Sequence, residues 1–88
     1  MARYDIHTDT VAQMGGTINA DVLFQMGILA STGRNGDANN IEAHKWFNLA
    51  ALKGKHEAAD YRAEITAEMS AQDVRQALKS AREWLKLH

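Results

Sequence analysis

The sequence predicts an all-α fold of about four helices arranged as antiparallel hairpins. The chain of 88 residues contains no proline, and it is rich in alanine, leucine, lysine, glutamate and glutamine, which favour helices. Its β-branched residues are scattered and do not alternate over the length of a strand. Apolar residues recur mainly at helical spacings, and the connections between these segments are short, which places successive helices antiparallel.

Residues 1–16 are expected to form a flexible or loosely docked arm, followed by one helical domain over residues 17–88. The apolar residues Ile6, Val11 and Met14 are five and three positions apart, which fits one helical face poorly. Chain termini are usually mobile unless other contacts hold them. The alternative is that the arm packs these side chains into a neighbouring groove, including a groove of another subunit.

The first helix is expected from about Asn19 to Thr32. Thr17 or Asn19 provides an oxygen that caps its amino end, and Gly33 suits the left-handed conformation that ends many helices. Its apolar face consists of Val22, Leu23, Met26, Gly27, Leu29 and Ala30. Gly27 costs about 1 kcal/mol relative to alanine inside a helix, which is reasonable where a second helix must approach closely.

The second helix is expected from about Asn40 to Lys53, before Gly54. Asn39 as its N-cap places Glu42 at the third helical position, which approximates a capping box. Its apolar residues are Ile41, Ala43, Trp46, Phe47, Leu49, Ala50 and Ala51. They wrap more than one side, and such a helix packs against two neighbours, as in a helical solenoid.

The third helix is expected over about residues 56–69 and the fourth over about residues 71–87. The core stripe of the third consists of Ala58, Tyr61, Ile65 and Met69, and that of the fourth of Val74, Leu78, Ala81 and Leu85. Ser70 precedes the fourth helix and Asp73 follows three residues later, which is an N-capping pattern. We expect these two helices to form the second hairpin.

Each of these two helices also carries a stripe of like charge. The acidic stripe consists of Glu57, Asp60, Glu64 and Glu68, and the basic stripe of Arg75, Lys79, Arg82 and Lys86. In an antiparallel hairpin the two stripes flank one seam, where each exposed ion pair contributes about 0.2–1 kcal/mol. The alternative is that the basic stripe binds nucleic acid or an acidic partner.

Composition excludes several function classes. The net charge of −1 argues against nucleic-acid binding, which usually needs a basic excess. The absence of cysteine excludes disulfides, zinc–cysteine sites and thiol catalysis. No apolar segment follows the early arginine as in a signal peptide, and no window approaches the ~18 apolar residues of a membrane span. We therefore expect a cytoplasmic protein without membrane association.

The sequence contains no recognisable catalytic or metal-binding constellation, so we expect no enzymatic activity, no cofactor and no metal. His56 and Asp60 share a helical face, but zinc needs three or four ligands. His44 shares a polar stripe with Asn40 and Asn48, and we expect this stripe on an exposed face or in a binding surface.

The two tryptophans are the largest side chains. Trp46 is expected in the core, because large aromatic residues dominate small cores. Trp84 lies near the end of the chain and is expected to be partly exposed. With Leu85 and Leu87 it forms a candidate apolar patch of the kind that marks interfaces.

Small and aromatic residues stand in a characteristic order in the central part of the chain. In order they are Ala20, Met26-Gly27, Gly33, Ala43, Trp46-Phe47, Ala50-Ala51, Gly54 and Ala58. This order resembles a Sel-one-like repeat, a relative of the tetratricopeptide repeat. By this resemblance, one full repeat covers about residues 20–55, and a degenerate repeat or cap covers residues 56–88.

The sequence departs from the repeat at three places. Ala30 stands where the family usually has tyrosine, Asn35-Gly36 replaces Gly-Val, and Asn39 replaces aspartate. The resemblance implies a tetratricopeptide-like, right-handed α/α superhelix whose concave face is a protein-binding scaffold. Because about three repeats are usually needed for stability, either the last helix closes the core or the chain self-associates.

We therefore expect a helical-repeat module that mediates protein-protein interaction as a non-catalytic adaptor or scaffold. Its groove would be lined from the first and third helices, with Gln25, Leu29, Tyr61 and Arg62 as candidate contacts for a protein partner. The alternative is a structural homo-oligomer, such as a homodimer, whose helix faces pack on a second copy.

Overall fold

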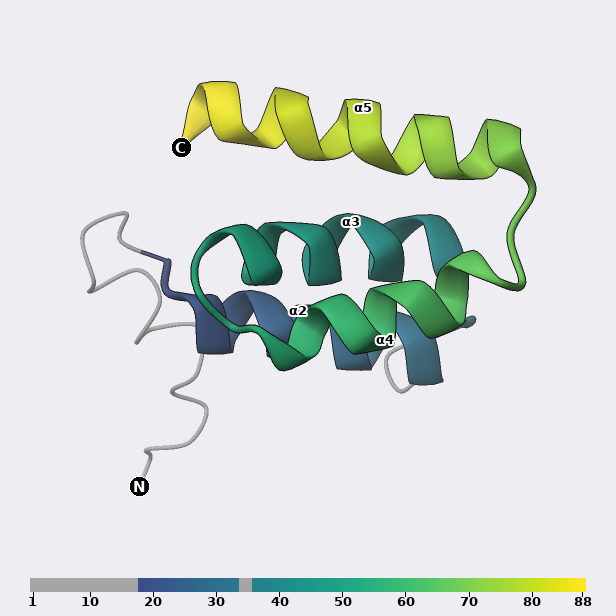
Figure 1. Ribbon diagram of the computed structural model, residues 1–88, viewed down its shortest axis with the longest axis horizontal. Helices are drawn as coiled ribbons and strands as arrows, with labels where there is room; N and C mark the ends of the chain where they lie inside the picture. Colours follow the sequence, from purple (N-terminus) through teal and green to yellow (C-terminus); the bar gives the residue numbers. More distant parts are fainter. Residues whose placement is uncertain (1–17, 34–35) are drawn as a thin grey trace.

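The computed structural model describes residues 18–33 and 36–88, and these residues form four helices and no strand. The helices are α2 (Ala20–Thr32), α3 (Asn40–Leu52), α4 (Glu57–Thr66) and α5 (Ala71–Leu87). Helix α3 lies at the centre, with α2 and α4 on one side of it and α5 on the other (Figure 1). The predicted all-α fold is confirmed. The expected arm, residues 1–16, lies outside the described residues.

Polar side chains cap the amino ends of three helices. Asn19, Asn39 and Ser70 accept hydrogen bonds from the backbone N–H groups of Val22, Glu42 and Asp73 at 2.9, 3.0 and 3.1 Å, respectively. Each bond satisfies one of the N–H groups that the first turn of a helix leaves without an intrahelical partner. These caps agree with the sequence prediction; Thr17, the alternative cap for α2, lies outside the described residues.

Glycines with a positive φ follow α2 and α3; the left-handed conformation was predicted for Gly33, and for Gly54 only that α3 ends before it. Gly33 has a φ of 72° and Gly54 a φ of 110°, values that L-residues with side chains rarely adopt. Helix α4 ends at Thr66, three residues earlier than expected. Beyond Thr66 the N–H groups of Glu68 and Met69 bond to carbonyls three residues back, so the chain continues in tighter turns.

An aromatic cluster where α2, α3 and α4 meet forms the centre of the core. Phe47 of α3 is fully buried, and its ring centroid lies 5.6 Å from that of Phe24 and 5.3 Å from that of Tyr61. The rings of Phe24 and Tyr61 meet edge to face at 5.0 Å. Because such pairs contribute about 0.5–1.5 kcal/mol beyond simple burial, this cluster ties the three helices together.

Gly27 lets α2 and α3 approach closely. A Cβ atom at Gly27 would lie 2.5 Å from both Cδ1 and Cε1 of Phe47, well inside van der Waals contact. The ring of Phe47 thus fills the space that the missing side chain leaves. The close approach expected from a glycine on the apolar face of this helix is confirmed.

The predicted second hairpin does not form. Helices α4 and α5 each pack against α3, and across the described residues they pack little against each other. The side of α5 that faces α3 buries Ala77 and Ala81, whose small side chains permit close packing, and Trp84 meets Trp46 edge to face at 5.9 Å. No ion pair in the described part of the chain joins the acidic and basic stripes.

Replacing Gly27 with alanine is expected to destabilise the protein by about 1–3 kcal/mol, the usual cost of overpacking a core. This cost outweighs the gain in helix propensity of about 1 kcal/mol, because the buried ring of Phe47 has little room to move. Urea unfolding followed by circular dichroism measures the difference. The double variant Gly27→Ala/Phe47→Leu should lose less free energy of unfolding than the two single variants lose in sum. A stabilised Gly27→Ala variant would contradict the contact.

Candidate functional site

A groove lies between α2 and α4, with Phe47 of α3 among its lining residues. Its volume is about 320 Å³. Residues that line it from the two helices and the turn after α4 include Ile28, Ser31, Tyr61, Glu64, Ile65 and Glu68. Ile28 and Ile65 are half-buried, and Tyr61 keeps 40% of its surface exposed although its ring packs on the core. We call this site the α2–α4 groove.

The groove lies at the carboxyl ends of two parallel helices. Helices α2 and α4 run in the same direction on one side of α3 (Figure 1). The groove residues of α2 lie in or just before its last turn, and those of the α4 side extend from Tyr61 in the middle of the helix to Glu68 in the turn after it. The carboxyl end of a helix carries a partial negative charge, and neither last turn contains a basic residue. Glu64 and Glu68 add exposed carboxylates. The α2–α4 groove therefore combines apolar surface with negative charge.

An ion pair connects the opposite, amino ends of these helices. Lys55, which precedes α4, places its Nζ atom 2.8 Å from Oδ1 of Asp21 in α2 and 5.2 Å from the ring centroid of Phe24. The hydrogen bond to Asp21 raises the pKa of Lys55. This contact links α2 to α4 at the end away from the groove.

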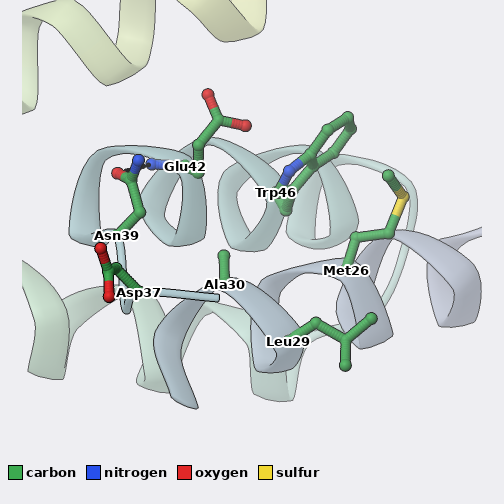
Figure 2. Close-up of a pocket in the computed structure, with 7 residues that line it drawn as sticks. All are labelled: Met26, Leu29, Ala30, Asp37, Asn39, Glu42 and Trp46. Carbon is green, nitrogen blue, oxygen red and sulfur yellow. Dashed lines mark hydrogen bonds between the residues drawn. The ribbon is translucent and has the colours of Figure 1, made fainter. Parts of the chain in front are cut away.

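A second, smaller concavity lies between α2 and α3, and we call it the α2–α3 hollow (Figure 2). Its volume is about 230 Å³, and it is lined by Met26, Leu29, Ala30, Asp37, Asn39, Glu42 and Trp46. Figure 2 shows Ala30 pointing toward α3 between Glu42 and Trp46. Ala30 is the position where the Sel-one-like pattern usually has tyrosine, so its small side chain leaves part of this space open.

The four contacts predicted from the sequence do not share one surface. Leu29 lines the α2–α3 hollow and Tyr61 lines the α2–α4 groove, while Gln25 and Arg62 line neither. Gln25 is exposed. Arg62 is half-buried and donates a hydrogen bond from a terminal guanidinium nitrogen to Oδ1 of Asn48 at 2.6 Å, so it joins α4 to α3.

The residues that carry the repeat resemblance occupy mostly structural positions. Gly27, Ala43, Phe47, Ala50 and Ala58 are buried, Ala20, Trp46 and Ala51 are half-buried, and Gly33 and Gly54 form turns. Trp84 is half-buried as expected, and it stacks on His88 with ring centroids 4.2 Å apart. Leu85 and Leu87 at the same end of α5 are exposed by 38% and 80%.

His44, expected on an exposed face, is instead buried, with 3% of its surface accessible. Helix α4 packs against α3 and covers its polar stripe, where Arg62 hydrogen-bonds to Asn48. Among the described residues Nδ1 of His44 finds no hydrogen-bond partner. Desolvation lowers the pKa of His44, and the positive charge of Arg62 lowers it further. His44 is therefore a neutral interior residue at pH 7.

Residues 18–33 and 36–88 contain no group of three or more side chains placed to bind a metal ion. No helix in these two segments is long and apolar enough to cross a membrane.

Comparisons of the chain with protein-family models, curated proteins and solved structures found no match. The resemblance to Sel-one-like repeats therefore rests on the residues that carry it.

Stability is expected to fall as the pH drops below 6.5, the ordinary pKa of histidine. In that range His44 binds a proton in the unfolded chain but stays neutral in the folded one, so protonation favours unfolding. The loss continues until the pH reaches the lowered pKa of the folded state. Urea unfolding between pH 7.5 and about pH 4.5 should show a smaller loss for His44→Gln than for the exposed control His56→Gln. Equal losses in the two variants would contradict this assignment.

Filling the α2–α3 hollow is expected to stabilise the fold. Ala30→Leu adds apolar atoms beside Met26 and Trp46, and cavity-filling changes commonly add about 0.5–2 kcal/mol. The control Ala38→Leu places the same side chain at an exposed position and should change stability little. The midpoint of urea unfolding measures both. A loss of stability in Ala30→Leu would show that the hollow cannot accommodate the larger side chain.

Proposed function

We propose that the protein is a non-catalytic protein-protein interaction module of the helical-repeat type, and that the α2–α4 groove holds a segment of its partner. The observation that carries this proposal is the combination of apolar surface between two parallel helices with exposed carboxylates at the carboxyl end of one of them, α4. A site of about 320 Å³ lies at the small end of the range for ligand pockets. It suits one or two anchoring side chains of a polypeptide.

Three features support a peptide as the occupant. Tyr61 and Ile65 present apolar surface that is only partly covered by the fold, and Tyr is favoured at interfaces because its ring is apolar and its hydroxyl polar. The hydroxyl of Ser31, which donates to the carbonyl of Ile28 at 3.1 Å, also lines the groove. The carboxylates of Glu64 and Glu68 favour a partner that carries lysine or arginine beside its apolar anchor.

The resemblance to Sel-one-like repeats supports the same class of function, since it implies a concave surface between the corresponding helices. Under this proposal the repeat resemblance reflects a shared scaffold. The cytoplasmic location is a separate prediction from the sequence.

Selection from a peptide display library, followed by NMR with the labelled chain, tests this proposal. We expect selected peptides to contain basic and apolar residues and to shift the amide signals of Ile28, Ser31 and Glu64 most. The variant Glu64→Lys should weaken binding several-fold because it reverses the charge at the groove.

The matched control is Glu83→Lys, which makes the same charge change at an exposed position on α5. It should leave peptide affinity unchanged. Peptides that shift signals elsewhere, or that bind Glu64→Lys as tightly as the control, would contradict the proposal.

A further inference from the structure

Helix α5 of the same chain carries basic residues beside apolar ones, the combination expected of a partner of the α2–α4 groove. Its basic stripe, Arg75, Lys79, Arg82 and Lys86, is exposed along the whole helix. No ion pair involves these four residues in the part of the chain that the structure describes. Beside the stripe, at helical spacing, lie the half-buried Val74 and Leu78 and the exposed Leu85. The outer surface of α5 is therefore basic with an apolar edge.

The acidic stripe on α4 and the turn after it is the counterpart of this surface. Glu57, Asp60, Glu64 and Glu68 are all exposed, and within the described residues only Glu57 lies near a cation, 4.0 Å from Lys55. Tyr61 and Ile65 of the groove lie beside the stripe on the same helix. The outer surface of α4 is therefore acidic with an apolar edge.

The two stripes also match in the number of sequence positions that they span. Arg75 to Lys86 spans 11 positions within α5, which corresponds to about 16 Å along the helix at ~1.5 Å per residue. Glu57 to Glu68 also spans 11 positions, of which the last two lie in the turn after α4. The intervals are three, four and four positions in the acidic stripe and four, three and four in the basic one. The intervals of the basic stripe are the same from either end. The two stripes therefore match equally well whether the two helices lie parallel or antiparallel.

Within one molecule these surfaces cannot meet, because α3 lies between α4 and α5 (Figure 1). We propose that α5 of one molecule docks along the α2–α4 groove of a second copy of the chain. This inference rests on the proposed role of the groove as a protein-binding site. The basic stripe of one copy then pairs with the acidic stripe of the next, and the apolar edges of the two helices cover each other.

The position of the two surfaces determines the kind of assembly. They lie on opposite sides of the molecule, so the contact is heterologous and each added copy leaves a free groove at one end and a free α5 at the other. Copies therefore add in a row instead of closing as a dimer. Repeat units stacked in this way extend the helical array that a single chain contains only in part.

Light scattering on the full chain over a wide concentration range, in low and in high salt, tests this inference. In low salt we expect a mass that rises with concentration from the 9.8 kDa of one chain past that of two chains. In about 1 M salt, where charges are screened beyond about 3 Å, we expect the mass to return toward that of one chain.

Two variants separate the two halves of the contact. The α5 variant Lys79→Glu/Arg82→Glu and the groove variant Glu64→Gln/Glu68→Gln should each be monomeric alone, with unchanged circular dichroism. Mixed in equal amounts, they should form a complex of two chains and no more, because only one intact groove and one intact α5 are present. Lys53→Glu, an exposed cation outside both stripes, should assemble like the unmodified chain.

A mass of one chain at every concentration in low salt, a constant mass of two chains, or assembly that both variants leave unchanged would overturn the inference. If the chain stays monomeric while display-selected peptides bind the groove, the proposed function stands and only the identity of the occupant is wrong. If neither a peptide nor a second copy occupies the groove, both proposals fail.

Discussion

The ring of Phe47 occupies the space that Gly27 leaves open, and the arrangement of α2, α3 and α4 depends on this contact. Because the ring lies so close to the backbone of α2, its other side is available to Phe24 and Tyr61. One side chain on the central helix thus contacts both α2 and α4. Through this aromatic cluster α2 and α4 both pack on α3, and the groove lies between these two helices.

Features that depend on neighbours in sequence were predicted well. Asn39 and Ser70 cap helices because the N–H groups that they bind are three residues away, and Gly33 ends α2 because its own backbone permits a positive φ. The amphipathic pattern of α5 likewise indicated that Ala81 is buried. It also placed Leu85 in the core stripe, which is wrong, because α3 does not cover that side chain and it is 38% exposed. Such features need no knowledge of the rest of the fold, so the sequence pattern is sufficient evidence for them.

Features that depend on the choice of partner helix were not predictable in the same way. The pattern of α5 indicates which face is buried but not whether α3 or α4 covers it, and the structure places α3 there. His44 was predicted to be exposed because it lies on a polar stripe of α3. In the structure it is buried, and on the same stripe Asn48 accepts a hydrogen bond from Arg62 of α4. Of the predicted contacts, Tyr61 lines the α2–α4 groove, whereas Leu29 lines the α2–α3 hollow. Whether a given residue faces the α2–α4 groove or the α2–α3 hollow depends on how α2 and α4 lie relative to each other, which the sequence pattern does not indicate.

The position of α5 has an electrostatic consequence for the whole molecule. Like charges four residues apart on a helix repel each other, and this spacing joins Asp60 to Glu64 on α4 and Arg75 to Lys79 on α5. A hairpin of α4 and α5 would offset both repulsions within one chain, but α3 separates the two helices. Each stripe therefore retains its repulsion until a surface of opposite charge approaches from outside. The packing that buries Ala77 and Ala81 against α3 thus leaves two stripes of opposite charge exposed on separate surfaces of the molecule.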